Sequence, residues 1–363
     1  MTRFNEPILV TRPFLPALED FKRGCEEIWQ SQWLTNNGPL LRRFQHKLSE
    51  YLCVPESNIA LFNNGTLALE LGYQAMGLSD CDVITTPFTF VATSHALKRI
   101  GATPIFADID PDSLCLDPKK CERLITSRTK AIVPVHVYGN PCDVEGFEQL
   151  RERYGVKIIY DAAHAFGVKE LVPSGDMSMY SFHPTKLFHS CEGGLLVFKN
   201  AALQAKLFEL RNFAIHSETE CADVGSNAKM NELQALMGLE CLKSIGDLLE
   251  YRKKIYDVYR FELLGCDTIK LISNSANKAY VPVLFKDFST RERVYSELKE
   301  KCNVYARRYF YPLLTDFAPY VYAHGTCPIA EDIAQRVLTL PTYHGLPLEY
   351  VRQIAQAVKE LSR

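Results

Sequence analysis

One lysine of this chain lies in a segment that could make its amine reactive. The segment SFHPTKLFHSCEGG surrounds Lys186 with apolar residues and little charge. Most lysines are solvated surface groups, but an amine that is removed from water has a lowered pKa and can form Schiff bases. Ser181, at the expected end of a strand, could add a hydroxyl to a phosphate site. The nearby His183, His189 and Cys191 match no common zinc spacing, so we predict no metal centre.

A carboxylate precedes this lysine in the chain. In VKIIYDAAHAFG, an apolar strand is expected to deliver Asp161 to its carboxyl end, with His164 just beyond it. A carboxylate at such a place could hold a proton on a heterocyclic ring nitrogen, as pyridoxal phosphate enzymes require. Taken alone, an aspartate that caps the next turn is the more common arrangement.

A third segment, LFNNGTLALELG, combines the end of a strand with the start of a helix at Gly65 and Thr66. The free N–H groups of a helix N-terminus, together with a hydroxyl, make a small anion site. The alternative is a simple helix cap and turn, which is common in any α/β fold.

These three segments need a scaffold that brings strand ends together. From about residue 58 to 200, short β-rich runs alternate with helical stretches, which predicts a large, mostly parallel sheet flanked by helices. Runs such as AIVPV and KIIY are apolar without alternation, as expected of strands that are covered on both faces. The expected strands are residues 58–62, 82–86, 103–109, 131–137, 156–160 and 177–182.

Helices and a second, smaller unit complete the predicted architecture. We expect helices at residues 15–32, 39–52, 201–213, 228–264, 292–301 and 348–362, and strands at 279–285 and 302–310. The change in pattern predicts a large cofactor-binding domain at residues 1–250 and a small C-terminal α+β domain at 251–363. The fold class is therefore α/β.

Composition excludes several classes of protein. The formal net charge is −2 over 363 residues, so no basic excess exists for nucleic-acid binding. No run reaches the roughly 18 apolar residues of a membrane helix. The N-terminal segment has no apolar core typical of a signal peptide. Twelve cysteines without a C-x-x-C pair indicate free thiols, and we expect a cytoplasmic protein with no membrane partner.

The order of the three segments, together with further motifs, resembles the fold-type I pyridoxal phosphate enzymes. Within them the sequence is similar to the DegT/DnrJ/StrS-type sugar-nucleotide aminotransferases. The resemblance covers nearly the whole chain and is carried by WLTNNGP, NNGTLAL, TTPFTFVATSHAL, PVHVYGNPCDV, YDAAHAFG, SFHPTK, GSNAKMNELQA and LTLPTYHGL. SFHPTK and GSNAKMNE are the most specific of these motifs.

The resemblance implies a role for each residue around the cofactor ring. Lys186 would hold pyridoxal 5'-phosphate covalently and then act as the base and acid of the proton transfer. Asp161 would pair with the pyridinium nitrogen, and Phe90 would stack on the ring face. His164 stands where many members have glutamine, near the ring hydroxyl, and a histidine N–H can serve the same purpose.

The same resemblance implies a phosphate site and a dimer. Gly65, Thr66 and Ser181 would bind the cofactor phosphate. Asn227, in GSNAKMNE, would reach that phosphate from the neighbouring subunit of a homodimer with shared active sites.

Substrate contacts follow from the resemblance as well. The expected sugar-side residues are Trp33, Thr35, His183, Lys229 and Tyr309. Lys229 replaces the family's usual arginine. The compact ammonium of lysine therefore stands where many members have a guanidinium that can form two parallel hydrogen bonds. The His-Ser-Cys run after SFHPTKLF is a second departure, and we expect it to reshape the pocket wall beside Lys186.

The implied reaction is transamination. Sugar dehydratases of this fold replace the lysine with histidine, whereas Lys186 is present here. We expect transfer of an amino group from L-glutamate to the keto carbon of a nucleotide-linked 4-keto-6-deoxysugar, with dTDP-4-dehydro-6-deoxy-D-glucose favoured. The alternatives are a 3-keto-6-deoxysugar aminotransferase, a lyase or dehydratase that uses the same cofactor, and a non-catalytic regulator of the same fold.

Overall fold

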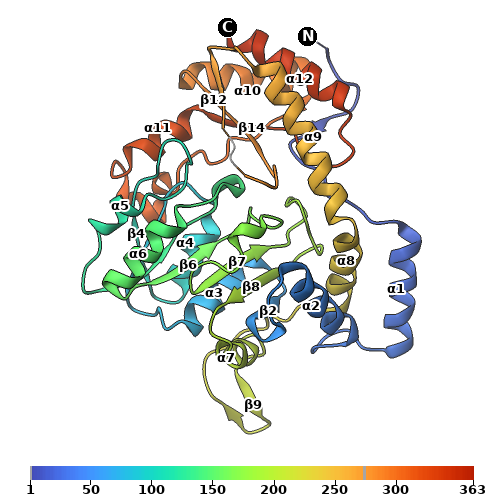
Figure 1. Cartoon of the computed structure of the whole chain (residues 1–363), viewed down its shortest axis with the longest axis vertical. Helices are drawn as coiled ribbons and strands as arrows, with labels where there is room; N and C mark the ends of the chain where they lie inside the picture. The colour runs from blue at the N-terminus through green and yellow to red at the C-terminus, as the bar shows by residue number, and fades with distance from the viewer. Residues whose placement is uncertain (1, 273–274) are drawn as a thin grey trace.

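A computed structural model describes residues 2–272 and 275–363. Its centre is a seven-stranded sheet in the order β2-β8-β7-β6-β5-β3-β4 (Figure 1). The strands are β2 Ile59–Phe62, β3 Asp82–Thr85, β4 Thr103–Phe106, β5 Thr129–Val133, β6 Lys157–Asp161, β7 Met177–Ser181 and β8 Gly194–Phe198. β8 is antiparallel to both of its neighbours, β2 and β7, and the other pairs in this sheet are parallel, so the predicted mostly parallel α/β sheet is confirmed.

The sheet is buried on both faces, which explains its continuous apolar strands. In β2, Ile59 and Leu61 belong to one core cluster, while Ala60 and Phe62 belong to another on the opposite face. Helices α2, α3, α4 and α7 lie against the strands or against one another. The helices of this part are α1 Leu18–Ser31, α2 Pro39–Leu52, α3 Gly65–Ala75, α4 Val91–Arg99, α5 Pro118–Glu122, α6 Val144–Tyr154 and α7 Leu203–Leu210.

A second core forms around the C-terminal part of the chain. An antiparallel sheet orders β11-β12-β14, with strands β11 Ile269–Leu271, β12 Val281–Phe285 and β14 Val337–Leu340. Helices α10 Phe288–Cys302, α11 Pro328–Arg336 and α12 Leu348–Ser362 accompany it. Phe4 and Ile8 pack into the same core, because β1 Ile8–Leu9 pairs with β13 Val304–Tyr305. The division at residue 250 stays a prediction.

The single helix predicted at 228–264 is wrong in detail. The structure has α8 Glu232–Lys243 and α9 Ile245–Leu263, separated at Ser244. Asn231 sets the start of α8 because its side chain accepts from the Gln234 N–H and the Gln234 side chain accepts from the Asn231 N–H. A serine competes for backbone hydrogen bonds and therefore favours a helix end.

The strand predicted at 302–310 is mostly absent. Only Val304–Tyr305 are in a strand, and Arg307 makes an isolated bridge to Thr339. The backbone then turns at residues 308–311, where the Tyr311 N–H donates to the Arg308 carbonyl at 2.8 Å, so the ladder does not continue. A small exposed hairpin, β9 Ile215–Ser217 and β10 Glu220–Cys221, was not predicted either. Across residues 2–272 and 275–363, every helix is too short or too polar to pass through a lipid bilayer.

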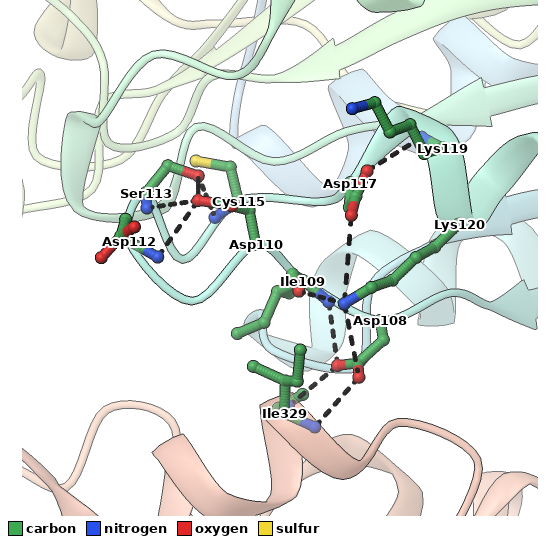
Figure 2. A network of polar contacts seen from close by, with 11 residues as sticks. Asp108, Ile109, Asp110, Asp112, Ser113, Cys115, Asp117, Lys119, Lys120 and Ile329 are labelled. Carbon is green, nitrogen blue, oxygen red and sulfur yellow. Dashed lines mark hydrogen bonds and ion pairs between the residues drawn. The ribbon is translucent and has the colours of Figure 1, made fainter.

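A buried aspartate ties α11 to the large sheet. Asp108, just after β4, accepts hydrogen bonds at 2.9 Å from the backbone N–H groups of Ile329 and Ala330 at the start of α11 (Figure 2). It also accepts from its neighbour Ile109, and the Lys120 amine lies 3.7 Å away. A carboxylate at this end of a helix satisfies free N–H donors and opposes the helix dipole. The contact therefore joins two segments more than two hundred residues apart.

This contact gives a stability prediction. We expect Asp108→Ala to lower the thermal unfolding midpoint by several degrees, because buried N–H groups left without an acceptor each cost about 1–3 kcal/mol. The matched control is Asp112→Ala in the same loop. Among the described residues, the Asp112 carboxylate pairs with the exposed Lys270 alone, and such surface pairs contribute little. Equal melting points for the two variants, measured by circular dichroism, would show that Asp108 does not tie the helix.

Candidate active site

A cavity of about 360 Å³ lies where β6 and β7 end. These strands are parallel neighbours, so the residues that follow them emerge at the same edge of the sheet. The predicted site residues that line the cavity are Gly65, Thr66, Phe90, Asp161, His164, Ser181, His183, Lys186 and Tyr309. Three distant segments of sequence therefore meet in one place.

The start of α3 forms one end of the cavity. Asn64 caps this helix, since its side-chain oxygen accepts from the Leu67 N–H at 2.8 Å. The N–H groups of Gly65 and Thr66 precede the first intrahelical donor and are left for another partner. A Cβ on Gly65 would lie 3.2 Å from the Ser181 Cβ, so a glycine lets the helix start approach the end of β7. The helix cap and the anion site, which the sequence left as alternatives, therefore coexist. The two N–H groups, together with the hydroxyls of Thr66 and Ser181, suit a phosphate.

The carboxylate of Asp161 is buried at the end of β6. One oxygen accepts from the Thr93 hydroxyl at 2.6 Å, and the other accepts from the Ala163 N–H at 3.0 Å. Burial raises the pKa of Asp161, although these two hydrogen bonds and the charge of Lys186 act in the opposite direction. Each carboxylate oxygen keeps a further lone pair beyond these two bonds, and Asp161 lines the cavity, so the carboxylate can face a cation placed there.

Lys186 lies in the turn that follows β7. Its amine is 3.4 Å from the hydroxyl of Tyr280, the residue just before β12. Desolvation inside the cavity lowers the pKa of Lys186, while the nearby Tyr309 and Asp161 oppose that shift. The lowered pKa increases the fraction of neutral, nucleophilic amine.

His164 is fixed as a neutral hydrogen-bond donor. Its Nδ1 accepts from the Tyr138 backbone N–H at 3.1 Å, so the proton of the neutral ring is on Nε2. Burial holds the pKa of His164 well below its usual value, and the positive charge of Lys186 lowers it further. The ring lies parallel to that of Phe310, with centroids 6.0 Å apart.

Phe90 is 56% exposed, unlike the buried apolar residues of the sheet. It is the residue before α4 and lines the cavity. An aromatic face that is left open in a cavity is suited to stack on a flat ring.

Four predicted residues lie away from the cavity of their own chain. Trp33, Thr35 and Asn227 are exposed, and the Lys229 amine donates to the side chain of Asn212. Their assignment to substrate or to a neighbouring subunit stays a prediction. His183 does line the cavity, where its Nδ1 contacts the Thr185 hydroxyl at 2.8 Å.

Several residues of the cavity were missed in the sequence. Thr93 holds Asp161, Tyr280 contacts Lys186, and Arg307 and Glu192 line the cavity. The motif around Phe90 contains Thr93, so a search for hydroxyls one helical turn further along could have found it. Arg307 and Tyr280 had no local signal, because they reach the site only through the packing of the C-terminal part.

The donor set fits pyridoxal phosphate. A helix N-terminus with hydroxyls suits its phosphate, a buried carboxylate suits its ring nitrogen, and a desolvated lysine suits its aldehyde. With the large, mostly parallel sheet, this arrangement defines a fold-type I pyridoxal phosphate-dependent enzyme. Residues 17–359 match the model of the DegT/DnrJ/EryC1/StrS aminotransferase family. The chain belongs to this family and is an aminotransferase.

Known proteins resemble the chain over its whole length. A dTDP-4-amino-4,6-dideoxy-D-glucose transaminase of Shigella dysenteriae is 41% identical, and the match covers 98% of this chain and 100% of that protein. The structure of DesI in the presence of its TDP-sugar product matches with a TM-score of 0.93 and 33% identity, covering 100% of this chain and 94% of that one. NtdA from Bacillus subtilis with bound cofactor PMP gives a TM-score of 0.86 and 29% identity, with 95% of this chain and 82% of that one covered.

The hydrogen bond from Thr93 to Asp161 gives a prediction for cofactor binding. Thr93→Val removes a donor that favours the charged carboxylate, so the pKa of Asp161 should rise further. We expect pyridoxal phosphate to bind about 10-fold more weakly, as for other hydrogen bonds to charged groups. The decline of binding toward acid should begin at a higher pH, because protonated Asp161 cannot pair with a cationic ring.

Fluorescence titration of cofactor-free protein across a pH series measures both effects. Ser94→Ala is the control, because the neighbouring Ser94 hydroxyl is buried without a hydrogen-bond partner among the described residues. Thr93→Val with the affinity and pH profile of this control would contradict the assigned role.

Proposed function

We propose that this aminotransferase transfers the amino group of L-glutamate to C4 of dTDP-4-dehydro-6-deoxy-D-glucose. The observation that carries the proposal is the cavity that combines Lys186, Asp161 and the start of α3. The choice of C4 is supported by the full-length similarity to the Shigella dysenteriae transaminase, whose name specifies a 4-amino sugar. A 3-keto substrate is the less supported alternative.

Each cavity residue has a distinct task in the proposed reaction. Bound pyridoxal phosphate supplies an electron sink that allows a proton to leave the carbon bearing the amine. Lys186 holds that cofactor and then moves the proton, which requires its amine to be neutral for part of the cycle. Asp161 would keep the ring nitrogen protonated, and the His164 Nε2–H would be available as a donor to the ring oxygen. Phe90 would cover the ring face and exclude water.

The proposal includes a homodimer that acts in the cytoplasm. Asn227 and Lys229 carry the resemblance to the family but lie outside the cavity of their own chain. A second copy that presents them to this cavity would account for both facts. All twelve cysteines lie within the described residues as free thiols, as is usual in a reducing compartment.

The role of Lys186 can be tested by spectroscopy. Wild-type protein should show a visible absorption band after addition of pyridoxal phosphate, and borohydride should fix the cofactor to one lysine. Lys186→Ala should lose both signals while its circular dichroism spectrum is retained. Lys253→Ala is the matched control, since this lysine is exposed on α9. A single borohydride-fixed adduct that persists in Lys186→Ala would show that another lysine holds the cofactor.

The substrate class can be tested with a panel of sugars. Purified enzyme is incubated with L-glutamate and nucleotide-linked 3-keto or 4-keto 6-deoxysugars, and formation of 2-oxoglutarate is measured. We expect turnover with the dTDP-linked 4-keto sugar and at least about 10-fold lower kcat/KM with 3-keto sugars, roughly the effect of losing one hydrogen bond in the transition state. Ammonia release or loss of water without 2-oxoglutarate would favour a lyase or dehydratase. If no 2-oxoglutarate, ammonia or dehydrated sugar forms, the result would favour a non-catalytic regulator of the same fold.

A further inference from the structure

Arg307 brings a cation to the cavity that the reaction described so far does not use. It lines the same cavity as Lys186, and its guanidinium donates to the Tyr309 hydroxyl at 2.9 Å. The neighbouring Arg308 is different, because Glu292 pairs with it at 2.9 Å. Within residues 2–272 and 275–363, no carboxylate forms such an ion pair with Arg307.

The backbone of Arg307 is held firmly. Its N–H donates to the Thr339 carbonyl at 3.1 Å, and its own carbonyl accepts from the Thr339 N–H and hydroxyl at 2.8 and 2.9 Å. The Tyr309 ring lies under the guanidinium, 5.5 Å from its central carbon, and the Tyr309 carbonyl accepts from Tyr138. A cation that is positioned in advance binds an anion with little loss of side-chain entropy.

Aromatic contacts connect this cation to the reactive lysine. The rings of Tyr309 and Tyr280 meet edge to face with centroids 6.2 Å apart, and the Tyr280 hydroxyl contacts the Lys186 amine. The charge of Arg307 contributes to the lowered pKa of Lys186. Arg307 thus acts on the end of the cavity where the reacting carbon must lie.

Other charges at the mouth of the cavity do not offer the same binding site. His183 lies 3.6 Å from the carboxylate of Glu192, and burial lowers its pKa toward a neutral ring. Glu192 itself would repel an anion. Arg307 is therefore the side chain best placed to bind an anionic group of a substrate.

We infer that Arg307 binds the carboxylate that is attached to the reacting carbon of the amino donor. This inference rests on the proposed function. In an amino acid, that carboxylate is one bond from the carbon that carries the amine, so it must lie beside Lys186. In a nucleotide-linked hexose, the phosphate is on C1, across the ring from C4, and lies farther from the lysine. A guanidinium also matches a carboxylate in a planar, bidentate arrangement.

The test uses cofactor-loaded protein and glutarate, which has the two carboxylates of glutamate but no amine. Isothermal titration should show that Arg307→Gln weakens glutarate binding about 10- to 100-fold, the usual loss for a hydrogen-bonded charge pair. The glutarate affinity of Arg307→Lys should be intermediate, because lysine keeps the positive charge but cannot form the two parallel hydrogen bonds of a guanidinium. Arg308→Gln, the matched control, should bind glutarate like wild type.

The two half-reactions separate the inference from the proposed function. Arg307→Gln should raise KM for L-glutamate in the donor half-reaction, while the sugar half-reaction of protein loaded with pyridoxamine phosphate changes little. Unchanged glutarate binding, or a defect confined to the nucleotide sugar, would overturn the assignment of Arg307. Wild-type protein that binds glutarate through Arg307 but aminates no sugar would instead overturn the proposed function alone.

Discussion

A negative charge buried at the end of β6 sets the requirements for the rest of the site. Asp161 is removed from water, and its hydrogen-bond donors are the neutral Thr93 hydroxyl and Ala163 N–H. Such a carboxylate is favourable only if a cation compensates for the lost hydration. The parallel pairing of β6 with β7 then determines where Lys186 emerges relative to it. The other parts of the site lie around this one charge: the cavity, Tyr280 and Tyr309, and the start of α3.

The net charge of −2 is compatible with phosphorylated ligands. Binding of nucleic acid needs many positive charges, because many phosphates are neutralised together. A single cofactor phosphate can instead be bound by the N–H groups at the start of α3 and the hydroxyls of Thr66 and Ser181. The local arrangement of hydrogen-bond donors can therefore bind a phosphate without an excess of positive charge over the whole chain.

The sequence predicted six of the seven strands of the central sheet, because those strands are apolar runs separated by helical stretches, but it missed β8 Gly194–Phe198. Asp161 and Ser181 end two of these strands and Gly65 begins the helix after a third, so their meeting at one edge could be predicted from parallel pairing. The break of the long helix at Ser244 and the loss of strand after Tyr305 were missed, because a local helix end and the turn at residues 308–311 interrupt patterns that look continuous in the sequence. Arg307 could not be predicted, since its place depends on a bridge to Thr339, which lies far away in the sequence.

The open face of Phe90 has a consequence for the protein as a whole. With Phe90 56% exposed, the apolar interior is incomplete at this point. A flat ring bound there extends the hydrophobic core, and a ligand that binds only the folded state stabilises that state by mass action. The supply of vitamin B6 in the cell would then govern the amount of folded enzyme as well as its activity.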